Sequence, residues 1–307
     1  MNELLHEFLE YGKRKKYKAH TIYDYRATIG EFFRFLHEIY PDVTEITNIT
    51  RDMIFAYEKH LMVRKDSRGK VMTRNRRKRY LLNLRTFFSY LLKEEKIYKN
   101  PVANVAIPRD KRTIIKDVLS IEEMERLLTS CEGDSAQKLR DRAILELLYS
   151  SGIRADELCA IEIDDIDLHE HTLFVRKGKW GSERIIPFGV LAGQWIARYL
   201  EKSRPLLHDF SSELLFVSMR GRRLQPQALC DLVKKYARLA GIEKNVTTHT
   251  FRHSCAVHML KGNADIRYVQ KQLGHKRIST TERYLRIEIT DLKEAHGRYH
   301  PREQEDW

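Results

Sequence analysis

The 307-residue chain has only four cysteines and no long apolar run. The cysteines are far apart and form no C-x-x-C pair, which argues against a zinc ribbon or a dithiol redox motif. We expect reduced, mostly buried thiols at Cys131, Cys159, Cys230 and Cys255. No apolar stretch approaches the roughly 20 residues that a membrane-spanning helix needs. The N-terminus also lacks the hydrophobic segment of a secretory signal, so the sequence predicts a cytoplasmic protein without a membrane partner.

The charge is strongly basic and unevenly distributed. Apolar residues make up 42% of the chain and charged residues 32%, as in a globular protein, and the net charge is +13. Residues 1–112 contain 25 basic and 14 acidic side chains, whereas residues 113–307 contain 31 and 29. A basic surface of this size favours a polyanion such as nucleic acid. An anionic membrane is disfavoured because no helical pattern places a basic stripe beside bulky apolar residues.

The length allows two domains, and the apolar spacing predicts a helical first one. We predict a first domain at residues 1–108, a linker at 109–118 and a second domain at 119–307. The linker is dense in charge and has no clear apolar period. Helices of the first domain are expected at residues 4–17, 21–40, 51–63 and 73–95.

The second domain is predicted to be helical with a small antiparallel sheet. Ser120 and Glu123 have the S-x-x-E spacing of a capping box, and Gly152 is a suitable residue to end the following helix. Two short strands are expected around a lysine-containing loop, at residues 171–176 and 182–188. Further helices are expected at residues 189–203, 226–241, 248–261, 265–273 and 279–286.

Residues 247–254 read TTHTFRHS and gather two histidines around an arginine. If Thr248 caps the helix, His249 and Arg252 lie on one face of its first turn. A helix N-terminus offers free N–H groups, and an arginine binds phosphate oxygens through two parallel hydrogen bonds. The stretch therefore favours a phosphate site.

A metal site is the alternative, because His249 and His253 are four residues apart. Zinc enzymes of the H-E-x-x-H kind carry a glutamate between the histidines, whereas here Arg252 lies between them and would repel a cation. We expect neither a metal nor a cofactor. Taken alone, the histidines could also be ordinary surface or core residues.

A third histidine and a tyrosine follow near predicted helix ends. Gly274 is expected to end one helix before His275, and Ser279 to Glu282 offers a second capping box that opens the helix carrying Tyr284. Both side chains would then be held next to a sharp turn. A lone tyrosine in such a place is usually structural.

Together these residues resemble the tyrosine recombinases, the Xer and phage integrase group. That family has an arginine in a segment like SGIRADEL, a lysine in a hairpin, the pattern H-x-x-R-H, then L-G-H, and a tyrosine nine residues after that last histidine. The matching residues are Arg154, Lys177, His249, Arg252, His275 and Tyr284. The resemblance covers nearly the whole chain and implies an N-terminal SAM-like, core-binding DNA-clamp domain followed by a catalytic domain.

The resemblance also implies a mechanism. Tyr284 would attack a DNA phosphodiester and form a 3′-phosphotyrosine, which keeps the bond energy and removes any need for ATP. His249 would act as the base, and Arg154 and Arg252 would bind the non-bridging oxygens. Lys177 would protonate the leaving 5′-oxygen.

Three further residues complete the implied site. Lys179 is two residues from Lys177 on the same loop and is an alternative general acid. His275 would donate a hydrogen bond to the phosphate. Glu157, three residues after Arg154, would support the catalytic residues without contacting the phosphate itself.

Two basic stretches are predicted to contact DNA phosphates. The first could equally be a solvated helix face. The second begins a helix whose later turns are apolar, so that its basic end projects from a packed element. The predicted contacts are Lys15, Lys16, Arg74, Arg76, Arg77, Lys78 and Arg79.

The implied partner is double-stranded DNA with an inverted-repeat site, bound by a homo-tetramer on two sites and passing through a Holliday junction. Alone, the protein would be a monomer or weak dimer. The tail after Tyr284 would dock on the neighbouring protomer, or it is a frayed end. A partner recombinase or an accessory protein is possible, and both dimer resolution and mobile-element transfer fit the resemblance.

Two alternatives to a recombinase remain. One is strand cleavage and resealing of the topoisomerase IB kind, and the other is DNA binding without catalysis.

Overall fold

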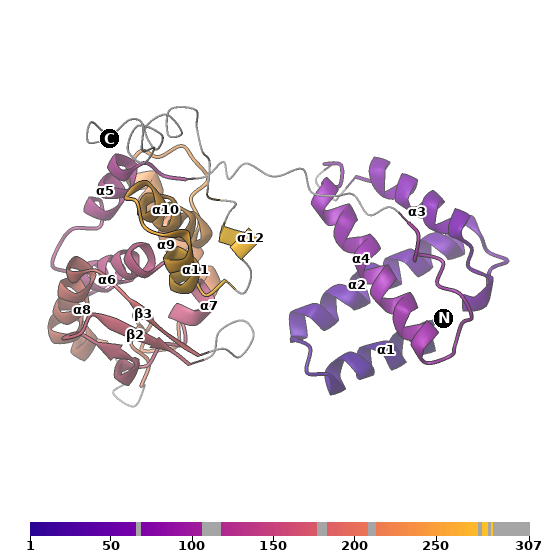
Figure 1. Cartoon of the computed structure of the whole chain (residues 1–307), viewed down its shortest axis with the longest axis horizontal. Helices are drawn as coiled ribbons and strands as arrows, with labels where there is room; N and C mark the ends of the chain where they lie inside the picture. The colour runs from indigo at the N-terminus through magenta and orange to yellow at the C-terminus, as the bar shows by residue number, and fades with distance from the viewer. Residues whose placement is uncertain are drawn as a thin grey trace, which may run out of the picture. The chain divides into compact units, whose positions relative to one another are not determined.

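The computed structural model describes residues 1–65, 69–105, 118–176, 183–207, 213–275, 278–281 and 284. The chain forms two compact units, Met1–Thr113 and Ile114–Trp307 (Figure 1). Both are rich in helix, and the described sheet lies in the second unit. The mainly helical fold class with a small antiparallel sheet is confirmed.

The first unit is a helical bundle, as the apolar spacing predicts. Its helices are α1 (Asn2–Arg14), α2 (Ala19–Ile39), α3 (Arg51–Val63) and α4 (Arg74–Lys93). Thr50 and Thr73 cap α3 and α4, each accepting a hydrogen bond from a backbone N–H in the first turn. Helix α2 packs against the other three.

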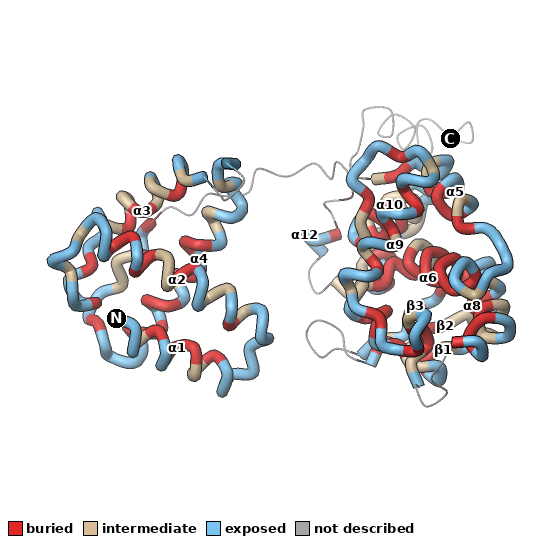
Figure 2. The backbone as a smooth tube through the Cα atoms, turned by 180° about the vertical axis from the view of Figure 1, so that it is seen from behind, coloured by how far each residue is buried: buried red, intermediate tan, exposed pale blue. Residues whose placement is uncertain are grey.

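Aromatic rings fill the core of this bundle. Phe8, Phe32, Phe87 and Phe88 are almost completely buried, and Tyr57 lies edge-on to Phe32 with ring centroids 5.0 Å apart. Edge-to-face pairs add to the free energy gained by burial. The apolar core therefore accounts for the fold of this unit, and buried and exposed stretches alternate along its helices (Figure 2).

The second unit surrounds one central helix. Helix α6 (Ala136–Ser151) is buried along most of its length and packs against α8 (Val190–Lys202) and α10 (Thr248–Lys261). Figure 2 shows α6 mostly in the colour of buried residues. The other helices are α5 (Ile121–Thr129), α7 (Ala155–Leu158), α9 (Pro226–Leu239), α11 (Ile266–Leu273) and α12 (Ile278–Thr281).

The sheet has three antiparallel strands in the order β1-β2-β3. Strands β2 (Thr172–Val175) and β3 (Arg184–Pro187) fall within the two predicted segments. Val175, the last residue of β2, pairs with Arg184, the first residue of β3. The prediction of two strands was incomplete, because β1 (Ile166–Asp167) pairs with β2. A two-residue strand is too short to produce an alternating apolar pattern.

Helix caps explain where the site helices begin and end. The capping box of Ser120 is confirmed, and Gly152 and Gly274 both end helices with φ of 62°. Thr248 was the wrong cap: Thr247 caps α10, reciprocally with Thr250. Ser279 lies inside α12 rather than before it, and its predicted partner Glu282 lies outside the described residues.

Helix α10 also holds the first described residues of the second unit. The backbone N–H of Leu119 donates to Ser254 Oγ at 3.0 Å, and its carbonyl oxygen lies 2.9 Å from Nε2 of His258. The other nitrogen of that ring, Nδ1, lies 2.8 Å from the hydroxyl of Tyr149 on α6. The start of this unit is therefore hydrogen-bonded to the same helix that carries His249 and Arg252.

Two simpler expectations concern cysteine and membranes. All four cysteines are free, and Cys131, Cys159 and Cys255 are buried as expected, whereas Cys230 is half-buried. Within the described ranges, we find no helix with the length and apolar character required to cross a membrane.

Candidate active site

Arg252 lies in the second turn of α10 and joins three helices. It is 3% exposed, and its Nη1 donates to the carbonyl oxygen of Gly152 at 2.6 Å. Its Nη2 donates to the carbonyl oxygen of Leu273 and to Nε2 of His275, the latter at 2.9 Å. Because the first two acceptors end helices α6 and α11, their otherwise unpaired carbonyl groups are satisfied by the guanidinium. Burial, followed by the charge of Arg154, lowers the pKa of Arg252 to about 10, so it remains a cation at neutral pH.

Arg154 caps α7 and is held by the carboxylate of Glu157. Its Nη1 donates to Oε1 at 2.9 Å, and its backbone N–H donates to Oε2 at 3.2 Å. Glu157 is buried, and burial by itself would raise the pKa of its carboxyl group. The hydrogen bond from Arg184 and the charges of Arg184 and Arg154 outweigh that effect, so the pKa is lowered and Glu157 is ionised.

His275 follows the left-handed turn at Gly274 and is a neutral imidazole. Its Nε2 accepts from Arg252, and its Nδ1 lies 2.9 Å from Thr281 Oγ1. Because arginine only donates, the proton is assigned to Nδ1, which then donates to the threonine. Burial, together with the charges of Arg252 and Arg154, which act in the same sense, lowers the pKa of His275 to about 4.

Tyr284 is 8% exposed and lies against two histidines. Its hydroxyl and Nδ1 of His253 share a hydrogen bond of 2.9 Å. Its ring is nearly parallel to the ring of His275, with centroids 6.3 Å apart. His249 lies one turn from His253 on α10, with ring centroids 6.3 Å apart.

The structure thus brings together five of the six predicted catalytic residues, with Glu157 beside them. The sixth, Lys177, and its alternative Lys179 lie outside the described residues. Sequence reasoning left His253 and Arg184 out of the site. His253 could have been found as the last histidine of H-x-x-R-H, whereas Arg184 has no comparable signal.

The predicted DNA contacts lie at two helix ends of the first unit. Lys15 and Lys16 are exposed just after α1, and Arg74 to Arg79 form the first turns of α4. Arg74, Arg76 and Arg79 are exposed, and Arg77 and Lys78 are half-buried.

A further basic turn lies in the second unit, ahead of α9, and was not predicted. Ser218 closes the turn: its N–H donates to the carbonyl oxygen of Arg222 at 2.8 Å, and its Oγ accepts from the N–H of Arg222 at 3.1 Å. Arg220, Arg222 and Arg223 are exposed. Helix α9, which follows, packs against α7 and α10, which carry Arg154 and Arg252.

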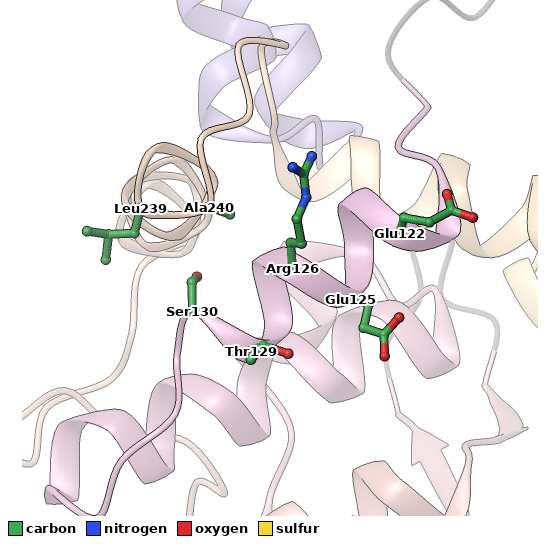
Figure 3. A pocket seen from close by; sticks show the side chains of 7 residues that line it. All are labelled: Glu122, Glu125, Arg126, Thr129, Ser130, Leu239 and Ala240. Atoms are coloured by element: carbon green, nitrogen blue, oxygen red, sulfur yellow. The ribbon is translucent and has the colours of Figure 1, made fainter.

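A shallow pocket on the second unit holds none of the predicted catalytic residues (Figure 3). Arg126 extends from α5 on one side, and Leu239 and Ala240 lie across from it at the end of α9. The lining residues are Glu122, Glu125, Arg126, Thr129, Ser130, Leu239 and Ala240. Among the residues that the structure describes, no group of three or more histidine, cysteine or acidic side chains could hold a metal ion.

The arrangement concentrates positive charge beside a phenol. His253 contacts the hydroxyl of Tyr284, and the ring of His275, to which Arg252 donates, lies beside the tyrosine ring. A tyrosine hydroxyl is a nucleophile once it loses its proton. An anion with a tetrahedral centre is the substrate that such a site suits, because arginine pairs bind its oxygens and stabilise added negative charge.

Comparison with known proteins gives the same fold and order of parts. The profile of the phage integrase family matches residues 117–290, and that of the phage integrase N-terminal SAM-like domain matches residues 5–95. Tyrosine recombinase XerD of Listeria monocytogenes is 34% identical over 310 residues, which cover 98% of this chain and 100% of that protein. Tyrosine recombinase XerC 2 of Ralstonia nicotianae is 35% identical over 285 residues, or 93% and 82% of the two chains.

Solved structures agree on the fold. The XerH recombinase in its post-cleavage complex with palindromic difH DNA has a TM-score of 0.74 at 23% identity, covering 95% of this chain and 83% of that one. The XerA recombinase has a TM-score of 0.54 at 28% identity, covering 98% and 99%.

A helical unit, a catalytic unit with arginines around a tyrosine, and these relatives define an enzyme of the tyrosine recombinase class, which transfers DNA strands at specific sites. The chain belongs to the phage integrase family.

Proposed function

We propose that Tyr284 is the nucleophile that cuts one DNA strand and becomes linked to its 3′-phosphate, releasing a 5′-hydroxyl. The observation that carries the proposal is the position of Tyr284. Its hydroxyl lies 2.9 Å from Nδ1 of His253, and its ring lies beside the ring of His275, to which Arg252 donates. Phenol has an ordinary pKa near 10, so attack at neutral pH needs a proton acceptor and a positive field. Rejoining reverses the step, and no external energy source is needed.

Arg154 and Arg252 are proposed to bind the two non-bridging oxygens of the scissile phosphate. Phosphoryl transfer depends mainly on positioning and on neutralising charge in the transition state. Arg252 is held rigidly by two helix-end carbonyl groups, and Arg154 by Glu157. Both guanidinium groups would therefore meet the phosphate with little reorganisation.

His249 is the proposed proton acceptor, and His253, which already contacts the hydroxyl, is a second candidate on the same helix face. Lys177 is the proposed general acid, with Lys179 as the alternative. His275 is proposed to donate to the phosphate. Since its Nε2 accepts from Arg252 without substrate, this requires the phosphate to displace that one hydrogen bond and the proton to move to Nε2, while the two carbonyl groups still hold Arg252.

The basic start of α4 is proposed to bind the DNA backbone, together with Lys15 and Lys16. A helix N-terminus carries a partial positive charge, so basic side chains are unfavourable there without an anion. Helix α4 has no acidic residue in its first turn and has five bases within its first six residues. A phosphate would relieve this repulsion. We add the turn of Arg220, Arg222 and Arg223 as a second backbone contact.

The assembly is also a proposal. Residues 1–108 would clamp the DNA, 109–118 would link the units, and 119–307 would carry the catalysis and a tail that docks on a neighbouring protomer. Four copies on two inverted-repeat sites would pass through a Holliday junction, with a partner recombinase or accessory protein where one is required. The named relatives XerC and XerD support a Xer-like protein that acts in the cytoplasm on the nucleoid, in dimer resolution or mobile-element transfer.

Covalent capture of DNA tests the nucleophile. Wild-type protein, Tyr284→Phe and Tyr268→Phe are each mixed with fragmented genomic DNA of the source organism, denatured, and the DNA attached to protein is sequenced. Tyr268 is 48% exposed on α11 and controls for the loss of a hydroxyl. We expect adducts at a few inverted-repeat sites with wild type and Tyr268→Phe, and none with Tyr284→Phe.

Two outcomes contradict this proposal. Adducts with Tyr284→Phe at the wild-type level would remove Tyr284 as the nucleophile. Absence of adducts with all three proteins would favour the alternative of a DNA-binding protein without independent catalysis.

A further inference from the structure

Arg184, the first residue of β3, contacts two elements that carry proposed catalytic residues. Its Nη1 and Nη2 donate to the two carboxylate oxygens of Glu157 at 3.1 and 2.8 Å. Its guanidinium also lies over Gly274, where a Cβ atom would be 2.8 Å from Nε and 3.0 Å from Cζ. The Arg184 side chain is therefore held between α7 and the turn that precedes His275, and only 13% of it is exposed.

Glu157 receives four hydrogen bonds, two from each of two arginines. Oε1 accepts from Nη1 of Arg154 and Nη1 of Arg184, and Oε2 accepts from the backbone N–H of Arg154 and Nη2 of Arg184. A carboxylate held at both oxygens by one planar guanidinium cannot rotate about its own bond. Arg184 therefore sets the plane of the carboxylate that holds Arg154.

The charges make a second contribution. Arg154, Glu157 and Arg184 together carry a net charge of one positive unit, because the carboxylate is ionised. Without Arg184, Glu157 would neutralise Arg154, and the buried carboxylate would face the incoming phosphate. An uncompensated buried charge is costly, and it would weaken any bond from Arg154 to an anion.

We infer that Arg184 is a positioning residue for strand cleavage: it fixes and neutralises Glu157 so that Arg154 is oriented and remains positively charged toward the scissile phosphate. This inference rests on the proposed role of Arg154. Strand β3 would then contribute to catalysis through Arg184, in addition to flanking the segment that contains Lys177.

The test compares two DNA duplexes that carry the site captured by wild-type protein. One has an ordinary scissile phosphodiester, and the other has a methylphosphonate there, which replaces a charged non-bridging oxygen by a methyl group and so needs less positive charge. Rates of covalent adduct formation are measured for wild type, Arg154→Ala, Arg184→Gln and Arg184→Lys. Arg198→Ala, which removes a half-buried arginine of α8 that pairs with Asp134, is the control.

On the phosphodiester, Arg184→Gln is expected to be slower by about 10²-fold, the size typical of a misplaced catalytic group, with unchanged DNA affinity. Arg184→Lys keeps the charge and should recover part of the rate. On the methylphosphonate, the defects of Arg184→Gln and Arg154→Ala should both shrink to a few-fold. A merely structural role predicts equal defects on both duplexes.

The two possible failures are distinguishable. If Arg154→Ala cleaves the phosphodiester like wild type, the proposed role of Arg154 fails. If Arg154→Ala behaves as expected but Arg184→Gln is equally slow on both duplexes, or as fast as wild type, the inference about Arg184 is overturned. Glu157→Gln is measured alongside, since it removes the carboxylate that Arg154 and Arg184 share without touching β3. Its defect must also shrink on the methylphosphonate, and a defect equal on both duplexes counts against the inference.

Discussion

At the scale of single residues, the hydrogen bonds of the two ring nitrogens of His275 determine its protonation state. His275 uses Nε2 toward Arg252 and Nδ1 toward Thr281, and both contacts suit the neutral ring. Protonation would place a hydrogen on Nε2 facing a guanidinium, which only donates. The lowered pKa of His275, about 4, follows from burial and from these neighbouring cations.

This lowered pKa predicts that the second unit loses stability as the pH falls. The unfolded chain binds a proton at His275 near the ordinary pKa of about 6.5, whereas the folded chain resists it until about pH 4. Stability is therefore complete above about pH 6.5 and is lost as the pH falls from there toward 4. His275→Gln should reduce this slope, by no more than about 1.4 kcal/mol per pH unit.

Tryptophan fluorescence during urea unfolding measures the slope, because Trp180, Trp195 and Trp307 all lie in the second unit. The control is His169→Gln, whose side chain is 92% exposed and which should leave the slope unchanged. Equal slopes for wild type and His275→Gln would contradict the assignment of a neutral buried ring.

The residue motifs predicted which side chains take part, but not how they contact one another. Arg154, His249, Arg252, His275 and Tyr284 are visible in the sequence because they occur in order and two of their spacings, within H-x-x-R-H and from His275 to Tyr284, are short and fixed. The contact of Tyr284 with His253 was not predictable, since it joins residues 31 positions apart across separate helices. Arg184 was missed for the same reason: its partner Glu157 is 27 residues away.

At the scale of elements, two left-handed glycines place the carbonyl groups and side chains of the site. Gly152 ends α6 and presents its carbonyl oxygen to Arg252, and Gly274 ends α11 just before His275. A Cβ atom on Gly152 would lie 2.8 Å from Leu273 Cδ2 and 3.2 Å from Cys255 Sγ. Backbone conformation and packing therefore both require glycine at residue 152.

Gly152→Ala is expected to lower the free energy of unfolding of the second unit by about 2–4 kcal/mol. About 1–2 kcal/mol comes from the left-handed backbone and a similar amount from the crowding against Leu273 and Cys255. Gly241→Ala is the matched control, because Gly241 has φ of 67° but a Cβ atom there would meet no heavy atom within 4 Å. Urea unfolding followed by tryptophan fluorescence measures both variants, and equal losses would show that crowding at Gly152 contributes nothing.

The elements with strong local signals were predicted, and the weak ones were not. Long amphipathic helices and the capping box of Ser120 follow from spacing and side-chain chemistry alone. The cap of α10 was misplaced by one residue because Thr247 and Thr248 are chemically equivalent, and only the fold decides which one turns out of the helix. Strand β1 is fixed by its pairing with β2, which the local sequence does not encode.

At the scale of the whole molecule, charge is divided between the two units. The first third of the chain holds most of the net positive charge, and the rest of the chain is nearly balanced, with 31 basic and 29 acidic side chains. We therefore expect general attraction to DNA to come mainly from the first unit. The sequence predicted this division because net charge needs no knowledge of contacts.

Replacing Arg76 and Arg77 with alanine should weaken DNA binding and make it less dependent on salt. Each lost phosphate contact is expected to reduce the slope of log affinity against log salt by about 0.9. Fluorescence anisotropy with a labelled duplex at several salt concentrations measures the slope. Arg198→Ala removes a half-buried arginine from the second unit and should leave the slope unchanged. An unaltered slope for the double variant would exclude α4 from the backbone contact.

The attachment of Leu119 to α10 determines where the chain can be divided. Ser254 and His258 bind the backbone of Leu119, and the latter ring is also joined to Tyr149. A fragment that began after Leu119 would remove one hydrogen-bond partner from Ser254 and one from His258, inside the helix that carries Arg252. An independently expressed catalytic fragment must therefore begin before this residue, and the functional border of the unit lies upstream of its first helix.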